Sequence, residues 1–242
     1  MMETESHLIG GNIKYWGVVP AAGIGSRMGA EVPKQYLPLA GSTVLEQTLH
    51  NMLGWGMLSG ITVALHPQDR WWHSLELATN PSIESVTGGE QRCDSVLAAL
   101  IALEDRAAPM DWVLVHDAAR PCVRGQEVRT LCEAVADDAI GGLLALPVAE
   151  TVKRSDASGR VSETLDRTSL WLAQTPQMFR YAALRESLAA AIAGDDPVTD
   201  EAAALERAGH RPLLVAGHRG NLKITRPEDL TLAAIALGSE DK

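Results

Sequence analysis

Residues 15–29 read Tyr15-Trp16-Gly17-Val18-Val19-Pro20-Ala21-Ala22-Gly23-Ile24-Gly25-Ser26-Arg27-Met28-Gly29, and Pro33-Lys34-Gln35-Tyr36 follows shortly after. The apolar run at 15–19 predicts a buried strand. Small residues directly after a strand let backbone N–H groups converge on phosphate oxygens. Arg27 and Lys34 add positive charge beside this loop. The stretch therefore predicts a strand that ends in a grip for a nucleoside triphosphate.

Two familiar glycine motifs fit this loop less well. A dinucleotide-binding fingerprint requires Gly or Ala where this chain has Met28, and an acid at the end of the second strand. Here the second apolar run, residues 61–65, ends in His66-Pro67. A P-loop would close with Gly-Lys-Ser or Gly-Lys-Thr, which is absent from this loop. The glycines alone would also fit a tight turn without function, but the two cations favour a phosphate site.

The length and composition are those of a globular protein. The chain has 242 residues, of which 46% are hydrophobic and 21% charged, and we expect one α/β domain over 1–242. No apolar run reaches the roughly 20 residues that cross a bilayer. Residues 1–7 are acidic and lack the cationic start of a signal peptide. We expect a cytoplasmic enzyme with no membrane partner.

Charge and cysteine content exclude further classes. The formal net charge of −10 argues against a nucleic-acid-binding surface, so a phosphate ligand must meet a local cluster of cations. Cys93, Cys122 and Cys132 are odd in number and lack the paired spacing of a zinc site. We expect reduced thiols, with neither a disulfide framework nor a structural metal site.

Apolar runs alternate with helical patterns along the first two thirds of the chain. The expected strands are 16–19, 61–65, 83–86, 112–115 and 142–146, and the expected helices are 43–53, 95–104 and 126–136. This βαβ order predicts a mostly parallel sheet in a three-layer α/β fold. Ligands of such sheets bind beyond the carboxyl ends of the strands. Further helices are expected at 182–193 and 200–208, a strand at 213–215, and a last helix from Pro227.

Residues 148–174 differ from the rest in being mostly polar. A turn signal at Ser158-Gly159 predicts a protruding β-hairpin arm. Because a lone hairpin is only marginally stable, we expect this arm to pack on a second subunit and form a homodimer whose sites are shared. The alternative is a mobile surface loop.

A second cluster of chemistry follows the strand at 112–115, in His116-Asp117-Ala118-Ala119-Arg120-Pro121. Mg²⁺ prefers oxygen ligands and often uses one or two carboxylates beside substrate phosphates, so Asp117 is the candidate metal ligand. Arg120 could hold an anionic second substrate. The alternative is a purely structural ion pair between Asp117 and Arg120.

Seven segments, taken in order, are similar to one known family. They are Pro20-Ala21-Ala22-Gly23-x-Gly25-x-Arg27-Met28, Pro33-Lys34-Gln35-Tyr36, Gly88-Gly89-x-x-Arg92-x-Asp94-Ser95-Val96, His116-Asp117-Ala118-Ala119-Arg120-Pro121, Thr175-Pro176-Gln177, Thr199-Asp200-Glu201-Ala202 and Asn221-Leu222-Lys223-Ile224-Thr225. Across nearly its whole length, the chain resembles the 2-C-methyl-D-erythritol 4-phosphate cytidylyltransferases of the non-mevalonate isoprenoid pathway.

The resemblance implies a Rossmann-like three-layer nucleotidyltransferase fold with a hairpin arm. It also implies that the CMP part of CTP is joined to the phosphate of methylerythritol phosphate and that pyrophosphate is released. Mg²⁺ or Mn²⁺ would serve as the metal, at Asp117. No covalent intermediate is needed, since such transfers rely on in-line positioning and on cations near the developing charge.

The resemblance also assigns residues to each substrate. Arg27, Lys34, Asp117 and Lys223 would be catalytic, and the nucleotide would be bound by Ala21, Ala22, Gly23, Gly25, Gly89, Glu90 and Ser95. The sugar phosphate would be bound by Asp117, Arg120, Thr151, Arg167, Thr175 and Lys223, with Thr151 and Arg167 supplied by the partner subunit. Without the resemblance, Ser95 could simply cap the helix that carries Val96 and Leu97, and Thr151 and Arg167 would be ordinary surface residues.

Two positions depart from the family pattern, and other functions remain open. Gly220 stands where some relatives carry an acid before Asn221, which puts a second metal-side carboxylate in doubt, and Glu90 stands where some relatives have Asp. The nearest competing function is a cytidylyltransferase for ribitol phosphate or another polyol phosphate. A non-catalytic nucleotide-binding regulator and a dehydrogenase are alternatives from other classes.

Overall fold

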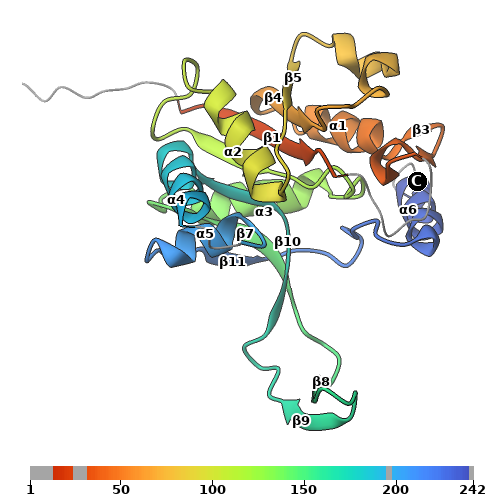
Figure 1. Ribbon diagram of the computed structural model, residues 1–242, viewed down its shortest axis with the longest axis vertical. Helices are drawn as coiled ribbons and strands as arrows, with labels where there is room; N and C mark the ends of the chain where they lie inside the picture. Colours follow the sequence, from red (N-terminus) through yellow and green to blue (C-terminus); the bar gives the residue numbers. More distant parts are fainter. Residues whose placement is uncertain (1–12, 24–31, 195–197, 240–242) are drawn as a thin grey trace, which may run out of the picture.

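A twisted seven-stranded sheet forms the centre of the molecule (Figure 1). The computed structural model describes residues 13–23, 32–194 and 198–239. The strands lie in the order β11-β7-β10-β6-β1-β4-β5. Their bounds are Tyr15–Ala21 for β1, Leu58–Leu65 for β4, Ile83–Thr87 for β5, Trp112–Val115 for β6, Gly141–Pro147 for β7, Trp171–Arg180 for β10 and Leu213–Ala216 for β11.

The predicted α/β class is confirmed. Strand β1 pairs in parallel with β4 and β6, β4 with β5, and β11 with β7. The exception is β10, which lies antiparallel between β6 and β7. Strand β10 was not predicted, because its middle, Gln174-Thr175-Pro176-Gln177, is largely polar although all four residues are buried. The register of β10 shifts between Ala173 and Gln177, at this polar segment.

The helices match the expected segments to within a few residues. They are α1 at Val44–Gly54, α2 at Arg92–Ala102, α3 at Gly125–Val135, α4 at Tyr181–Ala193, α5 at Glu201–Arg207 and α6 at Pro227–Ser239. Thr43 and Asp200 cap α1 and α5 by accepting N–H groups three residues ahead. Helix α2 begins earlier than expected, since Asp94 in its first turn accepts the N–H of Gln91.

Alternate residues of the central strands pack on opposite faces of the sheet. On β6, Val113 and Val115 belong to the core cluster with α2, α4 and α5. Trp112 and Leu114 belong to the opposite cluster, with α3. Because both faces of β6 are covered, this strand is apolar at every position, which is why a short apolar run was enough to predict it.

Short elements lie between the larger ones in the first part of the described chain. They are β2 at Pro38–Leu39, β3 at Ser42–Thr43 and the 3₁₀ turns at Lys34–Tyr36, Trp72–Ser74 and Glu76–Thr79. Within the described parts of the chain, no helix has the length and apolar character needed to span a membrane.

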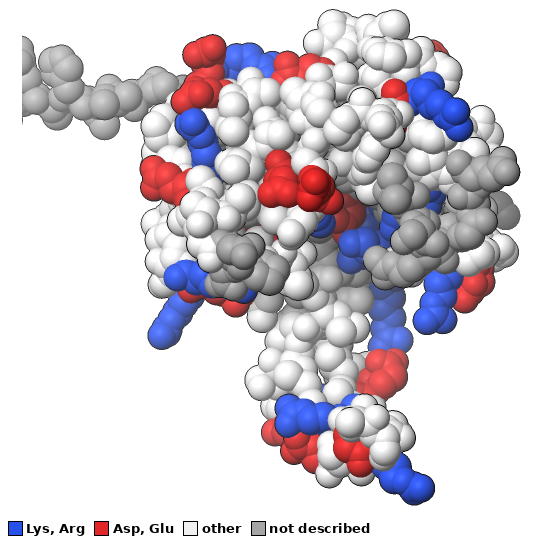
Figure 2. Space-filling model, in the orientation of Figure 1, with Lys and Arg blue, Asp and Glu red and all other residues white. Residues whose placement is uncertain are grey.

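A hairpin arm extends away from the body of the molecule, as expected (Figure 1). Its strands, β8 at Val152–Ser155 and β9 at Val161–Leu165, form a separate two-stranded antiparallel sheet. Side chains of both charges lie at its tip (Figure 2). Apolar side chains are also exposed: Val161 at 64%, and Leu172 at 57% near the base. The arm thus presents a mixed surface to its surroundings.

Candidate active site

A cavity of about 970 Å³ lies beyond the carboxyl ends of β1, β4 and β6. It is lined by residues 20–23, 34–35, 66–68, 88–92, 95, 117–119, 223 and 225. These segments are distant in the sequence and meet because parallel strands end at one edge of the sheet. The cavity therefore lies where the alternation of strands and helices predicts a ligand site.

The loop after β1 is held by a buried glutamine. Gln35 donates through Nε2 to the carbonyl oxygens of Ala21 at 2.8 Å and Gly23 at 3.0 Å. Its neighbour Lys34 lines the cavity, and its Nζ donates to the carbonyl of Ile224 at 3.0 Å. Gly25 and Arg27, the other predicted residues of this loop, lie outside the described residues.

The loop between β5 and α2 packs tightly on the first loop. A Cβ on Gly88 would lie 2.9 Å from the Cβ of Ala22, and one on Gly89 would lie 2.3 Å from the Cβ of Asp94. Only glycine therefore allows this approach. Ser95 ties the loop to the helix: its Oγ accepts from the N–H of Gly89 at 3.2 Å and donates to the Gln91 carbonyl at 3.1 Å.

The alternative interpretation of Ser95 as a helix cap is wrong, because Gln91 occupies the N-cap of α2. Gly89, Glu90 and Ser95, which the resemblance assigns to nucleotide binding, all line the cavity, and their contacts with a nucleotide stay predictions. Ser95 is 2% exposed and holds the loop in shape. The backbone of the loop is then the part that a base could contact.

Asp117, at the end of β6, is the electrostatic centre of the cavity. Its Oδ2 lies 2.9 Å from Lys223 Nζ and 3.1 Å from Arg120 Nε, and its Oδ1 lies 3.3 Å from Arg92 Nε. Burial opposes ionisation, but Arg92, Lys223 and Arg120 outweigh it and hold the pKa of Asp117 well below its usual range. The carboxylate is thus ionised, and it is shared by more cations than a single structural pair with Arg120 would need.

Arg92 also lines the cavity, although no role was predicted for it. Besides Asp117 it contacts Glu201, through Nη1 to Oε1 at 2.5 Å and Nη2 to Oε2 at 3.0 Å. These carboxylates raise the pKa of Arg92 against the effect of burial. Arg92 and Glu201 each lie in a segment that carried the resemblance, but 109 positions separate them. Only the family motifs marked them in the sequence.

His116 and Thr175 support Asp117 from behind. His116 is fully buried, which lowers its pKa to about 4, so the ring is neutral. Its Nε2 donates to the carbonyl of Arg120 at 2.9 Å, which leaves Nδ1 to accept from Thr175 Oγ at 3.0 Å. Thr175 Oγ in turn accepts the N–H of Asp117 at 3.0 Å. This chain fixes the backbone of the turn that carries Asp117.

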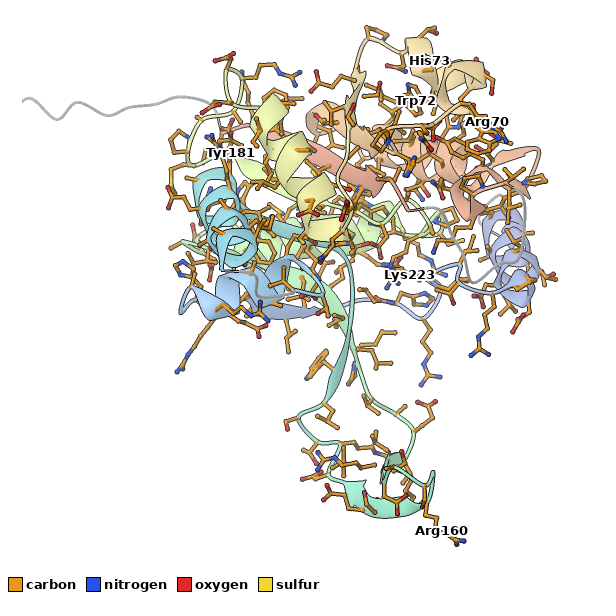
Figure 3. All side chains as sticks on the ribbon, viewed as in Figure 1. Arg70, Trp72, His73, Arg160, Tyr181 and Lys223 are labelled. Atoms are coloured by element: carbon orange, nitrogen blue, oxygen red, sulfur yellow. The ribbon has the colours of Figure 1, made fainter. Side chains whose placement is uncertain are left out.

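Lys223 reaches the cavity from a segment that is anchored on both sides. The preceding Asn221 accepts from Arg120 Nη1 at 2.7 Å through its carbonyl and donates to the Thr175 carbonyl at 2.8 Å. The following Ile224 donates its N–H to the Ala119 carbonyl at 2.8 Å. Lys223 therefore lies in the body of the molecule, whereas Arg160 marks the far end of the arm (Figure 3).

The six residues predicted for the sugar phosphate fall into three groups. Asp117 and Lys223 line the cavity. Arg120 and Thr175 are buried beside Asp117 and do not line it. Thr151 and Arg167 are exposed on the arm, where Arg167 donates to the Ala149 carbonyl. A single chain thus does not bring the six together, and their contacts with a substrate remain predictions.

The donor set fits a divalent cation held jointly with phosphates. Among the described residues, no group of three or more His, Cys, Asp or Glu side chains is arranged to hold a metal alone. Asp117 nevertheless offers an ionised carboxylate to the cavity, and Mg²⁺ commonly combines one or two carboxylates with substrate oxygens. At Gly220, a Cβ would lie 2.8 Å from His218 Nδ1, so a larger residue there would displace this ring.

Comparison with known proteins matches a family model to a range that includes all the residues lining the cavity. The family model for 2-C-methyl-D-erythritol 4-phosphate cytidylyltransferase matches residues 16–239. The chain belongs to this family. A cytidylyltransferase of this name from Pseudomonas putida (strain GB-1) is 50% identical over 217 residues, covering 89% of this chain and 92% of that protein. One from Pseudomonas aeruginosa (strain UCBPP-PA14) is 52% identical over 217 residues, covering 89% and 93%.

Solved structures of cytidylyltransferases in the same family share the fold. The Francisella tularensis enzyme superposes with a TM-score of 0.81 at 36% identity, covering 92% of this chain and 99% of that one. The Thermus thermophilus enzyme gives a TM-score of 0.76 at 31% identity, covering 93% and 100%. The chain thus matches these methylerythritol phosphate cytidylyltransferases over almost their whole length.

Proposed function

We propose that this protein transfers the CMP group of CTP to 2-C-methyl-D-erythritol 4-phosphate. The products are 4-diphosphocytidyl-2-C-methyl-D-erythritol, an intermediate in isoprenoid precursor synthesis, and pyrophosphate. The observation that carries the proposal is the arrangement of Asp117, Arg92 and Lys223 in one cavity with Lys34 and the glycine loops, in a member of this family. Such a cavity suits a reaction between two phosphate-bearing substrates.

The reaction is an in-line displacement at phosphorus. A phosphate oxygen of the acceptor attacks the α-phosphorus of CTP, the bond to the β-phosphate oxygen breaks, and pyrophosphate departs with the bonding electrons. Lys34 and Lys223 lie in the cavity, where their charges can neutralise the oxygens of the α-phosphate as negative charge develops. Arg27 takes the same role in our proposal. No protein nucleophile is required.

Magnesium, or another divalent ion such as Mn²⁺, would be held by Asp117 together with triphosphate oxygens and would neutralise charge on them. For the metal to bind this carboxylate, one of the three side chains that now contact Asp117 must move away from it. Lys223 is the best suited, because its side chain is 39% exposed and those of Arg92 and Arg120 are 26% and 10% exposed. Lys223 would then turn toward a phosphate.

Selectivity for cytosine follows from the loop at 88–91. Backbone N–H and C=O groups held by Ser95 can distinguish the exocyclic amine of cytosine from the carbonyl of uracil. The side chain of Glu90 is not required for this distinction, so its replacement of Asp is compatible with CTP recognition. Ala21, Ala22 and Gly23 would contact the nucleotide through their backbone.

We further propose a homodimer formed through the arm, in which each single-domain chain completes the site of its partner. Two features support this proposal. The arm exposes Val161, Trp171 and Leu172, and Thr151 and Arg167 do not reach the cavity of their own chain. We also place the enzyme in the cytoplasm, where free thiols such as Cys93 and Cys122 remain reduced.

The function is tested by measuring pyrophosphate release from the purified protein with CTP and Mg²⁺. Methylerythritol phosphate, ribitol phosphate and no acceptor are compared, and UTP and ATP replace CTP in parallel. We expect release only with CTP and methylerythritol phosphate. A preference for ribitol phosphate would assign the protein to polyol phosphate cytidylyltransferases, and silence with every acceptor would favour a regulator. Lys34→Ala, expected to fold normally, controls for a contaminating activity.

A further inference from the structure

Arg92 and Glu201 form a two-point contact at the inner wall of the cavity. Arg92 is the first residue of α2 and Glu201 the first of α5, so the pair joins two helix starts. The Glu201 side chain is 0% exposed, whereas that of Arg92 is 26% exposed and lines the cavity. One partner is therefore hidden and the other faces the ligand space.

The donors of Arg92 are only partly used. A guanidinium carries five N–H groups. The Nε–H contacts Asp117, and one N–H on each terminal nitrogen contacts Glu201. Each terminal nitrogen keeps a second N–H, for which no partner occurs among the described residues. These remaining donors belong to a guanidinium whose rotation is restricted by Asp117 at Nε and by Glu201 at the terminal nitrogens.

The fold does not need Glu201 to begin α5. Asp200 already caps this helix by accepting the N–H of Ala203 at 3.0 Å. Burying a carboxylate costs several kcal/mol unless a cation and hydrogen bonds offset it. An apolar residue would fill the position of Glu201 without that cost. The contacts of this buried carboxylate are with Arg92.

We propose that Glu201 is a positioning residue for cytidylyl transfer, which holds Arg92 so that its remaining N–H groups face phosphate oxygens bound in the cavity. This inference rests on the proposed function. Arg92 directly follows the 88–91 loop, expected to bind the nucleotide, and contacts Asp117, expected to hold the metal. Phosphate oxygens in the cavity could belong to CTP or to methylerythritol phosphate, and this position assigns Arg92 to the triphosphate of CTP. Without Glu201, Arg92 would be free to turn fully onto Asp117.

The test is a double-mutant cycle with Arg92→Met, Glu201→Gln and the double variant. Calorimetry gives the Kd of CTP with Mg²⁺, and kinetics give kcat and the KM of each substrate. Loss of a charged hydrogen bond donor is expected to weaken CTP binding by about tenfold or more in Arg92→Met. Glu201→Gln should weaken it by about fivefold, through Arg92. In the Arg92→Met background, Glu201→Gln should cause no further change in Kd or kcat.

A purely structural role predicts different results. In that case Glu201→Gln would lower Tm and leave Kd and kcat unchanged, or its effects would add to those of Arg92→Met, and either result overturns the inference. Glu46→Gln is the matched control: Glu46 is a buried acid in α1, bonded to Ser42 and the N–H of Glu76, away from the cavity. Glu46→Gln should lower Tm and leave the Kd of CTP and kcat unchanged.

The calorimetric measurement of CTP binding also separates this inference from the proposed function. If the wild-type protein binds CTP but does not transfer it to methylerythritol phosphate, the proposed function fails, while the binding cycle still decides the role of Glu201. If Arg92→Met and Glu201→Gln change the KM of the acceptor and leave the Kd of CTP unchanged, Arg92 faces the acceptor phosphate. Our assignment of Arg92 to the triphosphate is then wrong. A wild-type protein that binds neither CTP nor pyrophosphate would overturn the inference.

Discussion

A mixed dimer made from two inactive chains should regain activity if the arm completes the partner's site. One chain carries Lys34→Ala in its cavity, and the other carries Arg167→Ala on its arm. Lys34 lines the cavity of its own chain, whereas Arg167 lies on the arm, outside that cavity. If sites are shared, one of the two sites in the mixed dimer combines an intact Lys34 with an intact Arg167. The other site carries both substitutions.

The expected signal follows from these positions. Removing one preorganised charge donor costs about 100-fold or more in kcat, so the Lys34→Ala homodimer should be nearly silent. Loss of a charged contact to phosphate costs about 1.5–3 kcal/mol, or roughly 10- to 100-fold at low acceptor concentration, for the Arg167→Ala homodimer. A mixed dimer with one intact site should reach about half of the wild-type rate, far above both parents.

The assay requires dimers of known composition. The two chains are co-expressed with different affinity tags, purified over both, and assayed for pyrophosphate release at an acceptor concentration below KM. The mirror control pairs a wild-type chain with the double variant Lys34→Ala/Arg167→Ala. Shared sites leave this control nearly silent, and separate sites leave it at about half of the wild-type rate. A silent mixed dimer with an active control would refute the shared site, and failure to co-purify would refute the dimer.

Four other outcomes are expected. Arg167→Ala should raise the KM of the acceptor about tenfold and that of CTP little, which steady-state kinetics can check; equal changes would contradict its placement. Asp117→Asn should lower kcat about 100-fold or more at saturating Mg²⁺, and a near-normal rate would refute its role. Gly89→Ala, whose Cβ would lie 2.3 Å from that of Asp94, should shift the loop and reduce the preference for CTP over UTP in competition assays. Leu100→Ala, fully buried in the core, should lower the free energy of unfolding by about 3 kcal/mol in urea titrations, with little effect on substrate KM.

Local patterns in the sequence were sufficient to predict most elements and the edge of the sheet where the site lies. The run at 112–115 is apolar because both of its faces are buried, and polar residues, Asp117 among them, follow directly after the strand ends. Parallel strands bring such residues to one edge whatever their side chains are. Lys34 and Asp117 could therefore be assigned to one cavity before their contacts were known.

Tertiary structure decided the features that depend on pairs of distant residues. Strand β10 was not predicted because Thr175 and Gln177 are polar although buried. Hydrogen bonds to distant segments satisfy their polar groups, and these partners cannot be read from the local sequence. The contact between Arg92 and Glu201 spans 109 positions, and no local periodicity encodes it. Sequence by itself determined most of the strands and helices, since their apolar patterns depend on neighbours along the chain. Which cation meets which carboxylate depends on neighbours in space, and only the folded chain supplies them.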